Sequence, residues 1–295
     1  MMRLRHIRQR LRPEEALALL CVLPFVWMVV RHSATVHLNQ ATAVAYLAPA
    51  VVIGIALCLA KRTPHKVWPV VRDFLPFAIA VSVYENLHDV TAILHWPDRH
   101  EWLIAADEWL CGGINPVVWM QHWSNPRLTD ALTLAYSTYY FYVPLLALML
   151  YWRGQRVEFR DFMLAVVLTF YIGFIGYVAV PALDPWITLR DRLTVSLEGS
   201  HLANRALDLY TISRLKLPRD CFPSLHLAVS LVTLLFSWRM WRAAFWVGLP
   251  CVAALAVSTI YLRVHYLVDL IAAVPLALFS HWAAPRLNRW WSREL

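Results

Sequence analysis

Long apolar runs, each bounded by basic or polar residues, most constrain how this chain can fold. About eight runs approach the ~20 residues that a helix needs to cross a bilayer. The expected spans are Leu17–Val30, Ala41–Ala60, Asp73–Leu87, Ala131–Trp152, Phe162–Val180, Ser224–Trp238, Phe245–Tyr261 and His265–His281. Because hydrophobic residues make up 60% of the chain and charged residues only 16%, a water-soluble domain is excluded. The sequence predicts an all-α, polytopic membrane bundle of about eight transmembrane helices.

Basic residues between the runs predict the orientation of this bundle. The short segments 1–13, 61–72, 153–160, 239–242 and 285–295 are rich in Lys and Arg, as cytoplasmic segments are. Both termini are therefore expected in the cytoplasm, and the first run is expected to be a retained helix rather than a signal peptide. The net charge of +8 belongs to this pattern and does not require a nucleic-acid partner.

Two polar excursions, 89–130 and 182–222, then lie on the outer side. The first contains Ile114–Trp123, expected as a short helix at the interface with Trp119 and Trp123 as anchors. The second carries several cations, among them Lys216 and Arg219. The loop is long, but basic residues close to its end at Arg219 count against the predicted orientation, which the other segments still favour. On the outer side these cations could bind an anionic headgroup.

Two histidine motifs fall at the outer ends of predicted helices. Cys221-Phe-Pro-Ser-Leu-His226 begins the sixth span, and His265 begins the eighth span four residues before Asp269. Ionisable residues at membrane depth are costly, so they indicate function. Spacing of i,i+4 places His265 and Asp269 on one helix face, where the carboxylate can orient one imidazole nitrogen and leave the other to react. The predicted topology brings His226 and His265 to the same side.

These groups could perform phosphoryl transfer without a metal ion. Pro223 is expected in the first helical turn, which would leave the amides of Ser224 and Leu225 free to bind an anion. One histidine would attack phosphorus and the other would protonate the leaving oxygen, while Arg219 and Arg263 would hold phosphate oxygens. No cofactor is expected.

Each motif also has an ordinary explanation. A single histidine at a helix end is usually a wetted terminus, Pro-Ser is a common helix start, and His-x3-Asp often occurs by chance. A transporter that relays protons through the same residues is a rival from another class, although no repeat of the kind common in transporters is visible. Tyr136, Tyr139 and Tyr140 in the fourth span are expected to be packing residues.

The motifs carry a family resemblance. Phe222-Pro-Ser-Leu-His226 and His265-Tyr-Leu-Val-Asp269 resemble the second and third signature motifs of the type 2 phosphatidic acid phosphatase superfamily. Their form is similar to the inositol phosphorylceramide synthase branch, as are Tyr84-Glu85 and Pro181–Pro185. The resemblance implies that His265 becomes phosphohistidine, that Asp269 orients it and that His226 is the general acid. It also implies a six-helix catalytic core.

The chain departs from the superfamily in its cations. The first motif, Lys-x6-Arg-Pro, has no match, and Ser258 is followed by Thr259 where an arginine is usual. Arg219, Arg263 and Lys216 are substitutes by position alone. The synthase-like branch often lacks those cations, so the departure favours that branch.

Further expectations concern the headgroup, the cysteines and the domains. Glu85, Asn86 and His88 could bind a headgroup or an acceptor alcohol, or form only a polar cap. Cys111 and Cys221 both fall on the outer side and could form a disulfide. The chain divides into an N-terminal helix pair (1–68), a catalytic membrane domain (69–285) and a basic cytoplasmic tail (286–295).

The leading expectation is an integral membrane enzyme, in the inner or plasma membrane if bacterial, that uses lipids as phosphate donor and possibly as acceptor at the outer leaflet. Transfer of a phospho-headgroup between lipids is favoured over hydrolysis of phosphatidic acid or a polyprenyl diphosphate. The sequence leaves open the two lipids and the oligomeric state.

Overall fold

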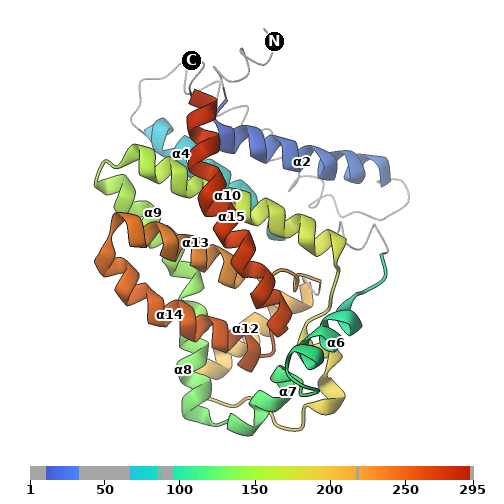
Figure 1. Cartoon of the computed structure of the whole chain (residues 1–295). Coiled ribbons are helices and arrows are strands. Elements are labelled where there is room, and N and C mark those ends of the chain that lie inside the picture. Colours follow the sequence, from blue (N-terminus) through green and yellow to red (C-terminus); the bar gives the residue numbers. More distant parts are fainter. Residues whose placement is uncertain (1–10, 33–66, 86, 88–95, 217–218, 293–295) are drawn as a thin grey trace.

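The computed structural model describes residues 11–32, 67–85, 87, 96–216 and 219–292. Every regular element in these residues is a helix, as the sequence predicted (Figure 1). The elements are α2 (Pro13–His32), α4 (Val67–Glu85), α6 (His100–Leu110), α7 (Pro116–Met120), η1 (Gln121–Trp123), α8 (Pro126–Ser137), α9 (Tyr139–Trp152), α10 (Arg156–Ala179), α11 (Pro185–Thr188), η2 (Arg190–Arg192), α12 (His201–Lys216), α13 (Leu225–Met240), α14 (Arg242–Tyr261) and α15 (Leu267–Ser292).

Four helical segments in the described residues are long and apolar enough to cross a membrane. They are Pro126–Trp152, Arg156–Ala179, Arg242–Tyr261 and Leu267–Ser292, and α13 is a shorter apolar helix. Each corresponds to a run expected to span, and so do α2 and α4. The expected span Ala41–Ala60 lies outside the described residues. The count of eight spans therefore stays a prediction.

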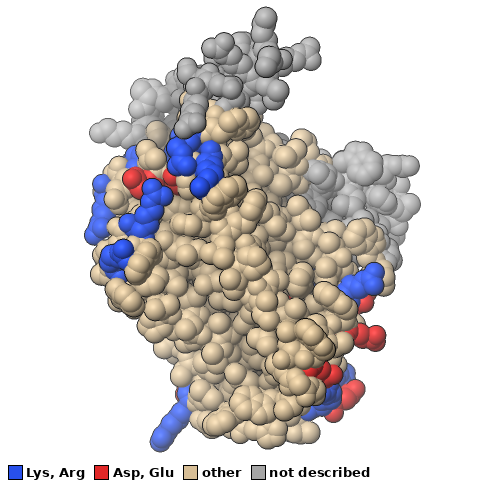
Figure 2. Space-filling model, viewed as in Figure 1, with Lys and Arg blue, Asp and Glu red and all other residues tan. Residues whose placement is uncertain are grey.

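The surface of the bundle is that of a membrane protein. Large apolar side chains are exposed along the spans, including Leu134 (71% exposed), Val247 (70%) and Ile175 (65%). Extensive apolar exposure of this kind is unfavourable in water. On the face shown in Figure 2, charged side chains gather towards the two ends and leave an uncharged belt between them.

Both polar excursions contain helices that the sequence did not reveal. α6 lies in the first excursion, and α12 lies in the second, where only loop was expected. The expected interfacial helix Ile114–Trp123 is present as α7 followed by η1, and Trp119 and Trp123 are exposed. α12 was missed because its apolar residues do not repeat strongly at helical spacing, so its polar sequence resembled a loop.

Several boundaries differ from the sequence expectation. The fourth span is broken at Thr138 into α8 and α9. α15 begins at Leu267, so His265 lies in the turn before the helix and not on its face. The same helix continues to Ser292, so residues 286–292 of the expected tail are helical.

The core is built around α10, which packs against α2, α4, α9, α13 and α15. At one end of the bundle, Arg72 pairs with Glu15 at 2.5 Å, and Arg12 pairs with Asp73. The indole of Trp291 donates to the carbonyl oxygen of Leu11 at 2.9 Å, which places the start of α2 beside the end of α15. This proximity agrees with termini on one side of the membrane, and which side that is stays a prediction.

Candidate functional site

The loop before α13 brings the first histidine motif to the eighth span. Ser224 is the N-cap of α13, and its hydroxyl oxygen accepts from the amide of Leu227 at 3.4 Å. The amide of Ser224 donates to the carbonyl oxygen of Asp269 at 3.1 Å. The expectation that this amide is free for an anion is therefore wrong, because it ties the two motifs together. Pro223 precedes the cap and lies outside the first helical turn.

Leu225 is the first residue of α13 and lies on the wall of the adjoining cavity. Its amide hydrogen-bonds to the hydroxyl of Tyr177. Of the two amides expected to form an anion nest, one is thus tied to the backbone of Asp269 and the other lies beside a tyrosine on α10.

Asp269 holds His265 as the spacing predicted. Its Oδ2 atom accepts from His265 Nδ1 at 3.2 Å and from the amide of Tyr266 at 2.8 Å. His265 is 1% exposed and Asp269 is fully buried. Because an ionised carboxylate only accepts, the imidazole proton belongs on Nδ1, and Nε2 keeps its lone pair.

That reactive nitrogen faces His226. His226 Nδ1 lies 3.0 Å from His265 Nε2, and the two rings meet edge to face. The topology argument brought these histidines to one side of the membrane, and the structure brings them into contact. With Nε2 of His265 accepting, Nδ1 of His226 is the donor, so Nε2 of His226 must accept a hydrogen bond.

Tyr136 supplies the hydroxyl that completes this chain. Its oxygen lies 2.8 Å from His226 Nε2, and the ring of Tyr139 packs against His226 with centroids 4.7 Å apart. Tyr139 packs as expected, whereas Tyr136 does more than pack, because its hydroxyl also bonds to His226. No spacing rule links α8 to α13 in the sequence, so no local signal indicated the contact.

The two arginines expected to hold phosphate have other partners. Arg219 forms a two-pronged pair with Asp98 through Nε (2.6 Å) and Nη2 (3.2 Å). The guanidinium of Arg263 donates to the carbonyl oxygen of Val195. Neither lines the cavity beside the histidines. Lys216 ends α12, and its side chain is outside the described part of the chain.

A cavity of about 150 Å³ adjoins the two histidines. In the described part of the chain its wall is mainly aromatic and acidic, and no lysine or arginine contributes to it. The lining residues are Tyr84, Glu85, Tyr136, Tyr139, Tyr140, Phe170, Tyr177, Tyr210, Asp220, Leu225, His226, Val264 and His265. Glu85 is thus placed at the cavity as expected for a headgroup residue, whereas Asn86 and His88 lie outside the described residues. Asp220 was missed, because nothing in its sequence neighbourhood distinguishes it.

The expected disulfide between Cys111 and Cys221 is not formed, since both are free thiols. The Cys221 thiol donates to Asp184 Oδ1 at 3.2 Å. Burial and the neighbouring carboxylates raise the pKa of this thiol, so it stays protonated and is a poor partner for oxidation.

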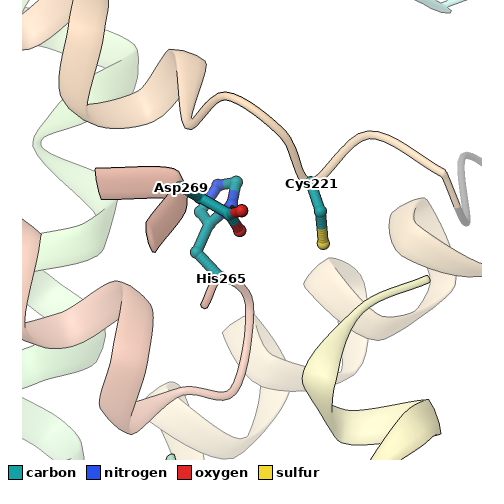
Figure 3. A group of neighbouring side chains, drawn as sticks. All are labelled: Cys221, His265 and Asp269. Atoms are coloured by element: carbon teal, nitrogen blue, oxygen red, sulfur yellow. The ribbon is translucent and has the colours of Figure 1, made fainter. Parts of the chain in front are cut away.

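Cys221 also lies near the second motif. Figure 3 shows His265 and Asp269 meeting, with Cys221 on the neighbouring loop. Their potential ligand atoms lie within 4.8 Å of one another, so this trio could hold a metal ion. As the structure stands, each of the three side chains is engaged in hydrogen bonds within the protein.

Asp107 fixes the start of α15. This buried residue of α6 accepts from the amides of Leu267 and Val268, each at 2.8 Å. A carboxylate at a helix N-terminus satisfies free amides and complements the helix dipole. Although these bonds oppose it, burial raises the pKa of Asp107. The first excursion therefore positions the helix that carries Asp269.

Comparison with known proteins agrees with this architecture. Residues 101–283 match the PAP2 superfamily, and the chain belongs to that superfamily. A PA-phosphatase related-family protein of Dictyostelium discoideum is 28% identical over 177 residues, which are 51% of this chain and 31% of the relative. The match thus spans about a third of that relative's length. No solved structure matches. With its apolar helices, this is an integral membrane protein of a superfamily of phosphatases and phosphotransferases that act on lipid phosphates.

Proposed function

We propose that the protein is a lipid phosphotransferase that works through phosphohistidine at the outer leaflet of the membrane, with residues 69–285 as its catalytic unit. The observation that carries the proposal is the buried chain from Asp269 through His265 to His226. It supplies a nucleophilic nitrogen with a fixed lone pair and an adjacent proton donor.

The reaction divides into two displacements at phosphorus. In the first, His265 Nε2 forms a bond to phosphorus as the bond to the leaving lipid oxygen breaks, and His226 gives its proton to that oxygen. In the second, an acceptor hydroxyl loses its proton to His226 and attacks phosphorus, and the N–P bond breaks. Since His226 Nδ1 now occupies the lone-pair direction of His265 Nε2, the phosphoryl group must separate the two rings when it binds.

The cavity supports a phosphodiester donor over a phosphate monoester. A monoester carries close to two negative charges at neutral pH, and the described wall offers carboxylates but no guanidinium or ammonium group. A diester carries a single charge, which a protonated His226 can balance. A headgroup phosphotransferase that resembles inositol phosphorylceramide synthases in its type of reaction is therefore our first choice. Lipid phosphate phosphatase activity is the second candidate, supported by the name of the Dictyostelium relative.

The test uses the purified full-length protein in lipid vesicles containing labelled phospholipid, with and without diacylglycerol or ceramide as acceptor. We expect a labelled headgroup phosphate on the acceptor, and loss of activity by about 10³-fold or more in His265→Ala and Asp269→Asn. Release of only free phosphate would establish the phosphatase. Wild-type activity in His265→Ala would refute the mechanism, and a proton-coupled transporter would show no turnover of lipid.

A further inference from the structure

The wall of the cavity has a composition that points to one headgroup chemistry. Six of its tyrosines surround the space, namely Tyr84, Tyr136, Tyr139, Tyr140, Tyr177 and Tyr210. Two carboxylates, Glu85 and Asp220, accompany them. Aromatic faces combined with a carboxylate attract an ammonium ion, because both present negative potential and the rings tolerate its methyl groups.

The carboxylate of Asp220 lines the same cavity as the histidine pair. The hydroxyl of Tyr84 donates to Asp220 Oδ2, which holds the Asp220 side chain beside α4. Asp220 also interacts electrostatically with Tyr139. The ring of Tyr139 packs against the ring of His226. Asp220 and His265 therefore line the same cavity, and the ring of Tyr139, which contacts His226, belongs to the same wall.

The aromatic wall continues onto α12. Tyr210 packs edge to face on Tyr136, with ring centroids 4.9 Å apart, and its hydroxyl bonds to Ser137 at 2.6 Å. Tyr140 stacks with Tyr210 at 6.4 Å. Two further rings thus line the cavity, Tyr210 from α12 in the second excursion and Tyr140 from α9.

Charge balance separates the possible headgroups. A lipid with a neutral polyol headgroup brings one net negative charge into a space whose described wall already holds two carboxylates. A zwitterionic lipid brings the same phosphate charge together with a cation. Its phosphate can meet the histidines while its cation meets Asp220 and the tyrosine rings.

We propose that the phosphate donor is a phosphodiester lipid whose headgroup carries an ammonium group, such as phosphatidylethanolamine or phosphatidylcholine. The proposal rests on the proposed phosphotransferase function and specifies its donor. Attack by His265 would break the bond between phosphorus and the diacylglycerol oxygen, His226 would protonate that oxygen, and the headgroup phosphate would remain on His265. Diacylglycerol is then released from every donor, whatever the acceptor.

Release of labelled diacylglycerol therefore compares the donors directly. Purified full-length protein would be given vesicles of an inert ether lipid containing one labelled donor: phosphatidylcholine, phosphatidylethanolamine, phosphatidylinositol, phosphatidylglycerol or phosphatidic acid. We expect kcat/KM for the better ammonium lipid to exceed that for phosphatidylinositol by about tenfold or more. Greater turnover of phosphatidylinositol, phosphatidylglycerol or phosphatidic acid would overturn the proposal.

Variants test the assigned carboxylate. Asp220→Asn should reduce kcat/KM for the ammonium lipid by about tenfold while that for phosphatidylinositol stays equal or rises. Glu85→Gln should likewise lower the ratio of kcat/KM for the ammonium lipid to kcat/KM for phosphatidylinositol. Glu101→Gln, which removes an exposed carboxylate of α6 outside the cavity wall, should leave the ratio unchanged. An unchanged ratio in Asp220→Asn that elutes as a folded, monodisperse protein would overturn the assignment.

A competition experiment covers the case in which Asp220→Asn does not fold. Glycerophosphocholine should inhibit the wild-type protein at lower concentration than glycerophosphoinositol, and the opposite order would refute the proposal. Different results would refute the phosphotransferase function and the ammonium headgroup. Absence of diacylglycerol from every donor, turnover of phosphatidic acid alone, or full activity in His265→Ala defeats the phosphotransferase itself, whereas preference for phosphatidylinositol or phosphatidylglycerol defeats only the ammonium headgroup.

Discussion

At the scale of single residues, the hydrogen-bond chain assigns a role to each group around His226. Asp269 fixes the proton of His265 on Nδ1, His226 donates to the free nitrogen, and Tyr136 donates to His226. When the phosphate binds and His226 becomes an imidazolium, its Nε2 becomes a donor, and the Tyr136 oxygen can accept from it. Tyr136 is thus a positioning residue for both protonation states.

Removal of that hydroxyl should weaken catalysis without removing the ring. We expect Tyr136→Phe to lower kcat by about tenfold, which is the value of one hydrogen bond, with little change in KM. The acidic limb of the pH–rate profile should also move, because His226 loses a partner in both of its states. Steady-state kinetics between pH 5 and 9 would measure both effects.

Tyr171→Phe is the matched control for this variant. Tyr171 is buried on α10, outside the cavity wall, and its hydroxyl has no hydrogen-bond partner in the described part of the chain. The Tyr171→Phe variant should retain the wild-type kcat and an unchanged pH–rate profile. An identical response of the two variants would mean that Tyr136 has only a packing role.

At the scale of elements, α10 fixes the loop that carries the first motif. A Cβ atom at Gly176 would lie 2.4 Å from Pro223 Cδ and 2.9 Å from the carbonyl oxygen of Phe222. Only glycine permits so close an approach of the helix to that loop. The loop in turn sets the position of His226 two residues into α13.

Gly176→Ala should therefore displace the loop and His226 with it. We expect a loss of about 1–3 kcal/mol in stability from overpacking, together with a loss of activity greater than the unfolded fraction explains. Thermal unfolding in detergent and phosphotransferase assays would be measured on the same preparation. Ile175→Ala is the control, because this neighbour is exposed to lipid and should affect neither quantity strongly. Equal activity per folded molecule in Gly176→Ala would contradict the close-approach argument.

The cap that α6 provides for α15 makes a second prediction at this scale. Asp107→Ala leaves the amides of Leu267 and Val268 without their acceptor, so it should cost about 1–2 kcal/mol of stability. Activity should fall as well, because Asp269 lies in the same first turn. Asp107→Asn keeps one acceptor oxygen and should be less impaired. Hydrogen exchange of the first turn of α15 would show the change, and equal protection in wild type and Asp107→Ala would refute the role of the cap.

At the scale of the whole molecule, orientation in the membrane is open to a direct test. The sequence predicts the turn between α9 and α10 inside and the segment before α12 outside. In a Cys111→Ser background, an impermeant maleimide should label Glu198→Cys in right-side-out vesicles and Arg153→Cys only in inverted vesicles. The reverse pattern would place the cavity on the cytoplasmic side.

The sequence by itself determined the class of fold and the three central residues. Apolar runs long enough to cross a bilayer exclude a soluble domain, so the all-helical membrane bundle followed from composition and length. Counting spans predicted only that His226 and His265 lie on one side of the membrane, and their contact came from the structure. The spacing of Asp269 from His265 predicted their pairing, but not its geometry, because His265 lies in the turn before α15 and not on the helix face.

Only the tertiary structure decided which other groups surround those residues. The hydroxyl of Tyr136, the carboxylate of Asp220 and the cap at Asp107 come from elements distant in sequence, and no local pattern relates them to the histidines. The structure likewise directed Arg219 to Asp98 and the Ser224 amide to Asp269. A sequence shows which residue types are available at a helix end, but pairing depends on distances across the bundle, which packing alone sets.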